Sequence, residues 1–176
     1  MSEAIYLRVM TEADTDDVVR WRNSNSVSSH FVYRKPLTRE DHLNWIETQV
    51  KTGRVAQFII VEAETQKALG SVYLRDIDNT HHKAEFGIFI GEDSARGKGY
   101  GTIATSLILE YAFKELKLNK VFLRVFADNP QAIACYKKAG FVEEGVFCED
   151  VWIDNKPYDM VFMRILRSEW GKNNES

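Results

Sequence analysis

The sequence predicts a mixed α/β (α+β) fold, in which helices flank a mostly antiparallel sheet. Three strand-like runs between residues 56 and 91, joined by short polar turns, indicate an antiparallel meander. A helical pattern over 103–116 leads into a β-branched strand at 120–127, an order typical of a crossover between parallel neighbours. The chain has 176 residues, of which 44% are hydrophobic, and this suits one domain with a sizeable core. We treat 1–176 as that domain, with a core at about 5–167 and a polar C-terminal tail.

The first elements are a strand at 6–10 and two helices that precede the main sheet. Each helix begins with a threonine followed three residues later by an aspartate, which is a capping-box pattern. These pairs are Thr11 with Asp14 and Thr38 with Asp41. The first helix covers 12–23, and Gly53 ends the second.

The remaining elements follow in a regular order. The meander strands are expected at 56–64, 69–77 and 83–91, followed by the crossover helix and the strand at 120–127. Asn129 is the N-cap of a further helix, with Pro130 at its first position and Gly140 after its end. Two last strands meet in a tight turn at 154–156. The predicted order is β-α-α-β-β-β-α-β-α-β-β.

Composition excludes several classes of function. The net charge is −3, so the chain has no broad basic field for nucleic acid. No run approaches the roughly 18 apolar residues of a membrane span, and the start does not read as a signal peptide, so we expect a cytoplasmic protein without a membrane partner. Cys135, Cys148 and the four histidines have no metal-ligand spacing. We expect reduced thiols and no metal.

The segment 94–102, SARGKGYGT, holds three of the ten glycines within five residues, between a strand and a helix. Bare amides at the start of a helix can point into one concavity and bind phosphate. The spacing fits neither the P-loop nor the dinucleotide pattern G-x-G-x-x-G. The alternative is a turn whose glycines serve helix packing only.

Arg96, Gly99 and Gly101 match the pattern Arg/Gln-x-x-Gly-x-Gly/Ala, and here the chain resembles the GNAT superfamily of N-acetyltransferases. The order of motifs over 5–167 is similar to the branch with ribosomal-protein, spermidine and nucleotide-linked amino-sugar N-acetyltransferases. The resemblance implies a central pair of splayed parallel strands that holds acetyl-coenzyme A as co-substrate. It also implies that the glycine loop holds the pyrophosphate and that Asn129 lies near the pantetheine arm. The implied loop residues are Arg96, Gly97, Lys98, Gly99, Tyr100, Gly101 and Thr102.

Two side chains are candidates for proton transfer. Tyr136, with Gly140 and Phe141, matches the family arrangement Y-x-x-x-G-F, and a tyrosine hydroxyl can protonate the departing thiolate. Glu85 lies on the strand before the glycine loop, where relatives often carry a base, either a carboxylate or a bound water. A lysine-like amine costs roughly 4 to 5 kcal/mol to deprotonate at pH 7, which is why a base is expected. The alternatives are a core tyrosine and an exposed strand glutamate.

Two further groups of residues complete the predicted site. Backbone amides near Ile88 and Phe89 are expected to polarise the thioester carbonyl if the strand bulges there. Acceptor recognition is assigned to Trp21, Arg22 and Asn23, which resemble amino-sugar-nucleotide acetyltransferases, where an aromatic ring stacks on a base and an arginine pairs with phosphate. The alternative places Trp21 in the core and Arg22 on the surface.

The predicted function is direct transfer of the acetyl group to a primary amine of a small molecule, with a nucleotide-linked amino sugar as the first candidate. A polyamine or a protein N-terminus is the alternative acceptor, and the acidic residues at 143–150 are compatible with a polyamine. A non-catalytic acyl-coenzyme A sensor and a protein-interaction module are alternatives of other classes. A homodimer through the edges of the last strands is left open.

Overall fold

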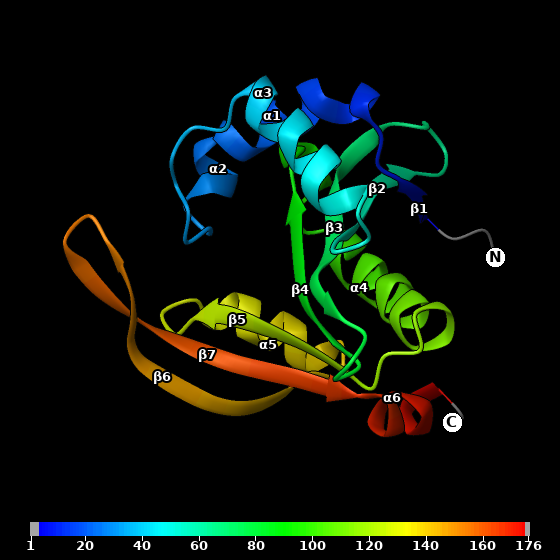
Figure 1. Cartoon of the computed structure of the whole chain (residues 1–176), viewed down its shortest axis with the longest axis vertical. Helices are drawn as coiled ribbons and strands as arrows, with labels where there is room; N and C mark the ends of the chain where they lie inside the picture. The colour runs from blue at the N-terminus through cyan, green and yellow to red at the C-terminus, as the bar shows by residue number, and fades with distance from the viewer. Residues whose placement is uncertain (1–3, 175–176) are drawn as a thin grey trace.

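A single seven-stranded sheet runs through the computed structural model, which describes residues 4–174 (Figure 1). The strands are β1 (Ile5–Val9), β2 (Ala56–Glu62), β3 (Ala68–Asp78), β4 (Lys83–Ile90), β5 (Lys120–Phe126), β6 (Val142–Ile153) and β7 (Lys156–Leu166). Their order across the sheet is β1-β2-β3-β4-β5-β7-β6. All neighbours are antiparallel except β4 and β5, which are parallel. This confirms the predicted fold class.

The helices include the segments that follow the predicted caps Thr11, Thr38 and Asn129. They are α1 (Thr15–Asn23), α2 (Asn25–Ser28), α3 (Arg39–Trp45), α4 (Tyr100–Glu110), α5 (Pro130–Lys138) and α6 (Arg167–Asn174). Both predicted capping boxes are formed, the first around a short turn at Glu12–Asp14 that leads into α1 and the second at the start of α3. α2 was not predicted, because its four residues are too few for a periodic pattern.

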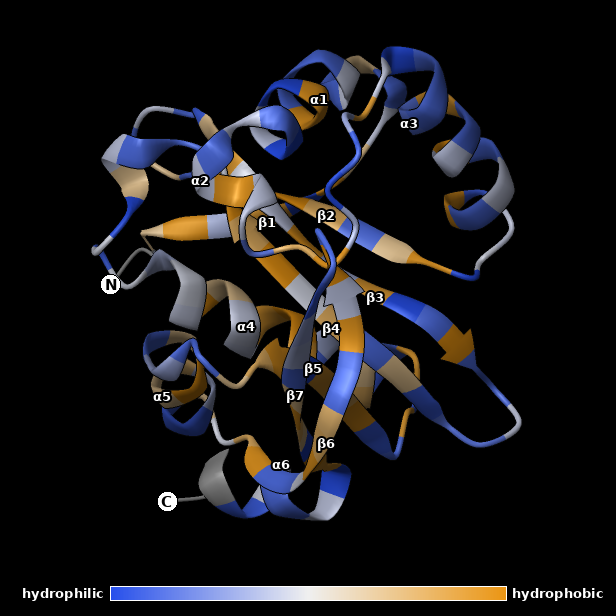
Figure 2. Ribbon diagram, turned by 90° about the vertical axis from the view of Figure 1, so that its left-hand side faces the viewer, coloured by the Kyte–Doolittle hydropathy of each residue, from blue (hydrophilic) through white to orange (hydrophobic). Residues whose placement is uncertain are grey.

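The two faces of the sheet carry separate hydrophobic cores. The larger core packs Ile108 of α4 against the sheet, together with Phe113 of the π-helical turn that follows this helix (Tyr111–Glu115), with α5 at its border. The smaller core joins α1 to the opposite face through Trp21 and Phe89. Figure 2 shows the hydrophobic residues gathered on the strands between helices whose outer sides are hydrophilic.

β4 and β5 separate soon after they meet. They pair only at Lys83 with Lys120, Ala84 with Val121 and Glu85 with Phe122. Beyond Glu85, β4 remains paired with β3 as far as Ile90, while β5 remains paired with β7 as far as Phe126. The two strands diverge visibly in Figure 1. A length of β4 that includes Gly87, Ile88 and Phe89 therefore has no strand partner on one side.

Two details of the prediction are wrong. The register between β3 and β4 is continuous past Ile88 and Phe89, so β4 has no bulge there. The residues after 167 do not form only a polar tail, because α6 places the Trp170 ring 5.4 Å from the ring of Phe113. The apolar residue in an otherwise polar segment was the signal for this contact.

No helix within residues 4–174 is both long enough and apolar enough to cross a membrane. In the same part of the chain, no three His, Cys, Asp or Glu side chains lie where they could hold a metal ion together.

Candidate active site

The glycine loop presents bare backbone to open space. Gly97 and Gly99 have φ values of +73° and +79°, and a Cβ atom built at either residue would meet no heavy atom within 4 Å. Gly99 is the N-cap of α4, whose first amides lack intrahelical partners. The loop therefore combines free amides, positive helix-end potential and room for a ligand, and these features suit a pyrophosphate.

Of the two basic side chains of this loop, Arg96 forms hydrogen bonds to other residues of the chain. Its Nη2 donates to the Ile90 carbonyl oxygen at 2.9 Å and to Ser26 Oγ at 3.0 Å, which ties the loop to α2. Lys98 forms no ion pair within residues 4–174, and its Nζ lies 5.8 Å from the centre of the Tyr100 ring. The pattern favoured Arg96 for phosphate, whereas the geometry leaves Lys98 as the freer cation.

Tyr100, Gly101 and Thr102 fix the start of α4. The Tyr100 hydroxyl donates to Glu62 Oε1 at 2.9 Å, and the Thr102 amide donates to the Gly99 carbonyl oxygen. The Gly101 carbonyl oxygen accepts from Thr105 Oγ1 at 2.7 Å. These contacts hold the glycine loop without a ligand, so its conformation is prepared in advance.

A Gly99→Val substitution should weaken coenzyme A binding by tenfold or more, on the order of 1.4 kcal/mol. The positive φ disfavours a β-branched residue, and the new side chain would occupy the open space where the pyrophosphate must approach. Calorimetric titration with coenzyme A measures the effect. Gly53→Val is the control, because Gly53 also has a positive φ and open space but lies outside the loop. Equal affinity in folded Gly99→Val protein would remove the loop from the cofactor site.

Tyr136 lies on α5 against the unpaired part of β4. Asn129 starts this helix as its N-cap, since its Oδ1 accepts from the Ala132 amide at 3.2 Å. The Tyr136 ring packs on Phe86 and Phe141, with ring centres 5.9 and 6.0 Å apart. Burial raises the pKa of Tyr136 to about 12, with Tyr73 as a smaller contributor. The hydroxyl is therefore protonated at neutral pH, as a proton donor must be.

Tyr73 is a site residue that the sequence analysis missed. It pairs with Gly87 across β3 and β4, and a Cβ atom on Gly87 would lie only 2.3 Å from Tyr73 Cζ. The ring therefore crosses the bare backbone at the point where β4 has left β5. Its hydroxyl has no hydrogen-bond partner within residues 4–174, and burial raises its pKa. An aromatic residue directly opposite a glycine on the next strand was the available signal.

Glu85 is buried between two arginines. Its carboxylate accepts four hydrogen bonds, two from Arg75 at 3.0 and 3.2 Å and two from Arg124 at 2.9 and 3.5 Å. The predicted alternation is present, with Glu85 and Gly87 on one face, but the Tyr73 ring fills the space above Gly87. Since a base must offer a free lone pair, these four hydrogen bonds favour a carboxylate that is held in place over one that acts as a base.

The three predicted acceptor residues fall into different environments. Trp21 is 1% exposed, and its Nε1 donates to Glu92 Oε1 at 2.8 Å, so neither ring face is available and the stacking role is wrong. Asn23 exchanges two 2.8 Å hydrogen bonds with the backbone of Leu37, which fixes the loop before α3. Of the three, Arg22 is the residue that is still a candidate for acceptor recognition. Its side chain is half-buried, with its Cζ 3.5 Å from the centre of the Phe31 ring.

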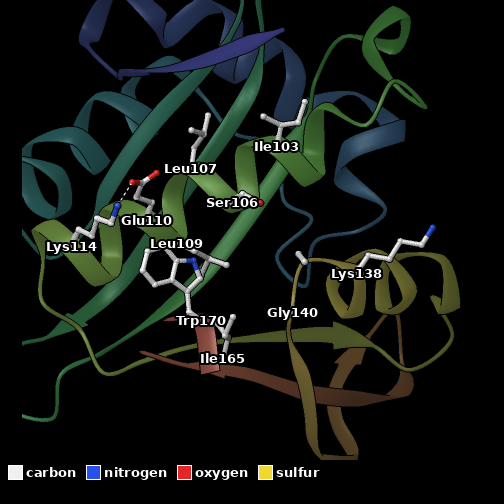
Figure 3. Close-up of a pocket in the computed structure, with 11 residues that line it drawn as sticks. Ile103, Ser106, Leu107, Leu109, Glu110, Lys114, Lys138, Gly140, Ile165 and Trp170 are labelled. Atoms are coloured by element: carbon white, nitrogen blue, oxygen red, sulfur yellow. Dashed lines mark hydrogen bonds and ion pairs between the residues drawn. The ribbon is translucent and has the colours of Figure 1, made fainter. Parts of the chain in front are cut away.

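A cavity of about 550 Å³ opens between α4 and the C-terminal end of α5. Figure 3 shows Leu107 and Glu110 of α4 on one side, Lys138 and Gly140 on the other, and Trp170 between them. None of the predicted site residues lines this cavity. Its lining does not include Tyr73 of β3, Glu85 of β4 or Tyr136 of α5, the candidates for catalytic chemistry.

Comparison with known proteins gives consistent results. The family model described as an acetyltransferase (GNAT) domain matches residues 4–142. The spermidine N(1)-acetyltransferase of Vibrio cholerae serotype O1 is 29% identical over 175 residues, which cover 99% of this chain and all of that protein. The spermidine N(1)-acetyltransferase of Escherichia coli K12 is 35% identical, over 96% of this chain and 89% of the relative.

Solved structures agree with these sequence matches. The crystal structure of spermidine N-acetyltransferase from Vibrio cholerae in complex with CoA and spermine superposes with a TM-score of 0.89. It is 27% identical and covers 96% of this chain and 99% of the matched chain. The glycine loop, the splayed strands and these matches together show that the chain belongs to the GNAT family of N-acetyltransferases.

Proposed function

We propose that this enzyme transfers the acetyl group of acetyl-coenzyme A directly to a primary amine of a small molecule. The observation that carries the proposal is the position of Tyr136, whose protonated hydroxyl adjoins the unpaired part of β4. The glycine loop follows the same strand, so one element connects a phosphate cradle to a proton donor. Asn129, at the start of α5, lies on the path proposed for the pantetheine arm.

Different residues of the chain have different roles in the proposed reaction. Bound acetyl-coenzyme A supplies the thioester from which the amine takes the acetyl group. Because β4 has no bulge, only alternate amides near Ile88 and Phe89 point away from β3, and the amide that points to the free edge polarises the carbonyl oxygen. Tyr136 donates its proton to the departing sulfur and regains one from solvent or from the amine. Cys135 is exposed and its thiol forms no hydrogen bond to a base within residues 4–174, which supports direct transfer.

Glu85 supports the site through its arginines. Accepting a proton would weaken four hydrogen bonds, remove the counter-ion of Arg124 and leave Arg75 with only Asp76 at 3.9 Å. We therefore assign Glu85 as a positioning residue for Arg75 and Arg124, and a water on the acceptor side as the group that takes the amine proton.

Two observations bear on the identity of the acceptor. The relatives named spermidine N(1)-acetyltransferases favour the polyamine alternative over the nucleotide-linked amino sugar that the sequence suggested first. The acidic run at 143–150 gives this alternative weaker support, because Glu144 pairs with Lys120 at 2.8 Å and Glu143 pairs with Lys137 at 3.7 Å. A polyamine is therefore the first acceptor to test.

Thiol release from acetyl-coenzyme A, measured with a panel of amines, tests the proposal. The panel contains spermidine, amino sugars with and without phosphate, and peptides with a free N-terminus. At least one primary amine should give turnover well above hydrolysis. Stabilisation by coenzyme A without turnover on any amine would support a sensor, and no stabilisation would support an interaction module.

A homodimer also stays a prediction. β6 is at the edge of the sheet and carries exposed apolar side chains at Val146, Phe147 and Trp152, of which Trp152 is 66% exposed. Sedimentation of the purified protein would show whether a second copy covers this edge.

A further inference from the structure

Arg22 is a half-buried cation without a counter-ion. Within residues 4–174 its guanidinium takes part in no ion pair and no hydrogen bond, and burial lowers its pKa. Other arginines nearby have carboxylate partners within 4.0 Å: Arg20, Arg75, Arg96 and Arg124. A cation that is partly removed from water is unfavourable unless something compensates it.

The surrounding residues hold this guanidinium in place. Arg22 lies 3.5 Å above the centre of the Phe31 ring, and Phe31 in turn packs edge-on against Phe89 with ring centres 5.9 Å apart. Its two neighbours fix the end of α1, since Trp21 is bonded to Glu92 and Asn23 to the backbone of Leu37. The cation–π contact offsets only part of the lost hydration and leaves the donors of the fork unused.

The position of Arg22 connects it to the reaction. Phe31, Phe89 and Tyr73 pack in one hydrophobic cluster, so the guanidinium above Phe31 lies near the Tyr73 ring, and its charge opposes the rise in the pKa of Tyr73 that burial causes. Tyr73 in turn contributes to the raised pKa of Tyr136. Tyr73 crosses Gly87 where β4 has left β5. Arg22, Tyr73 and Tyr136 therefore form a row that leads to the proposed site of acetyl transfer.

We propose that Arg22 and the Tyr73 hydroxyl bind an oxyanion, a phosphate or a carboxylate, that the acceptor carries beside its amine. The five N–H donors of an arginine fork match such a group, and neither donor set has another partner in the described chain. A polyamine would instead bring a second cation against Arg22. The inference rests on the proposed acetyl transfer. It predicts an acceptor that bears an anion beside its amine, in contrast to the polyamine that the named relatives favour, and kinetics with matched acceptors decide between the two.

Anion binding to the protein saturated with coenzyme A tests the inference, because the coenzyme then occupies the glycine loop. Inorganic phosphate and acetate are titrated at constant ionic strength, and the shift in the midpoint of thermal unfolding gives their dissociation constants. Arg22→Gln should weaken binding by at least about tenfold. Lys35→Gln removes the same charge from an exposed residue of the loop after α2 and should change binding by less than about twofold.

The two probes distinguish a phosphate from a carboxylate as the natural group, and Arg22→Lys shows whether the fork or only the charge is needed. A wild-type protein that neither anion stabilises overturns the inference, as does Arg22→Gln protein that binds both anions normally. If Arg22→Gln fails to fold, Tyr73→Phe serves as the second variant. It should measurably weaken the binding of whichever anion the wild-type protein binds more tightly.

Matched acceptors give an independent kinetic readout. The pairs are glucosamine 6-phosphate with glucosamine, O-phosphoethanolamine with ethanolamine, and 4-aminobutyrate with putrescine. Wild-type kcat/KM should favour the anionic member of at least one pair, and Arg22→Gln should remove that preference by raising KM. Preference for spermidine, strengthened by Arg22→Gln, would overturn the inference, while turnover with any amine would leave the proposed function intact.

Discussion

Replacing Tyr136 with phenylalanine should lower kcat by roughly 10²- to 10⁴-fold, the range for a positioned general acid. The phenylalanine ring keeps the packing on Phe86 and Phe141, so folding and coenzyme A affinity should change little. Only the hydroxyl is lost, and it has no hydrogen-bond partner within residues 4–174 whose loss would disturb the fold. The effect therefore isolates the chemistry of proton donation.

The measurement is a pH profile of kcat with one active acceptor, combined with a coenzyme A titration. Because the pKa of Tyr136 is raised to about 12, the wild-type enzyme should show no loss of the acid on the alkaline side below that value. In the companion variant Glu85→Gln, the low-pH limb of kcat/KM should remain if a water takes the amine proton. Full activity in Tyr136→Phe would reject the acid role.

Trp21→Ala should lower the free energy of unfolding by about 3–5 kcal/mol, as truncation of a buried aromatic residue does. The ring is 1% exposed, packs edge-on against Phe89, and lies under the backbone of Gly91. A stacking role in acceptor recognition would predict a raised acceptor KM, whereas burial predicts lost stability. Urea denaturation measures the change, and a stable variant with altered acceptor KM would restore Trp21 to the site.

Trp21→Phe is the matched control, because it keeps an aromatic ring and removes the hydrogen bond to Glu92. Arg20 and Trp21 lower the pKa of Glu92 from 4.5 to about 2. This carboxylate therefore stabilises the fold above pH 4.5, and its contribution is lost as the pH falls toward 2. Trp21→Phe should lose less stability than the wild type over that acid range. An unchanged pH dependence would show that Trp21 contributes little to the shift.

Local signals predicted most of the fold. The threonine and aspartate pairs at two helix starts, Asn129 with Pro130, and the turn at 154–155 are short-range patterns, and the structure forms each of them. The parallel pairing of β4 and β5 followed from the strand–helix–strand order. Such features depend on neighbours in the chain, which a sequence displays directly.

Features that depend on distant neighbours were not predictable in the same way. The sequence did not show that Glu85 meets arginines from two other strands, or that Glu92 binds Trp21 across 71 positions. The motif around Trp21 to Asn23 was interpreted as a unit, but helix geometry turns its three side chains in different directions. Trp21 enters the core, Asn23 fixes a loop, and Arg22 lies over the Phe31 ring.

The short seam between β4 and β5 has a mechanical consequence. Three residue pairs join the strands, so the sheet behaves as two panels, β1–β4 and β5–β7, each braced by longer antiparallel ladders. Pairing over three residues resists bending only weakly. The stiffness of the sheet then depends on the contacts that join the two panels where β4 and β5 have separated. A ligand that hydrogen-bonds to both strands acts as a clasp. Such a ligand would add hydrogen bonds across the short pairing of β4 and β5 and so limit the bending of one panel against the other.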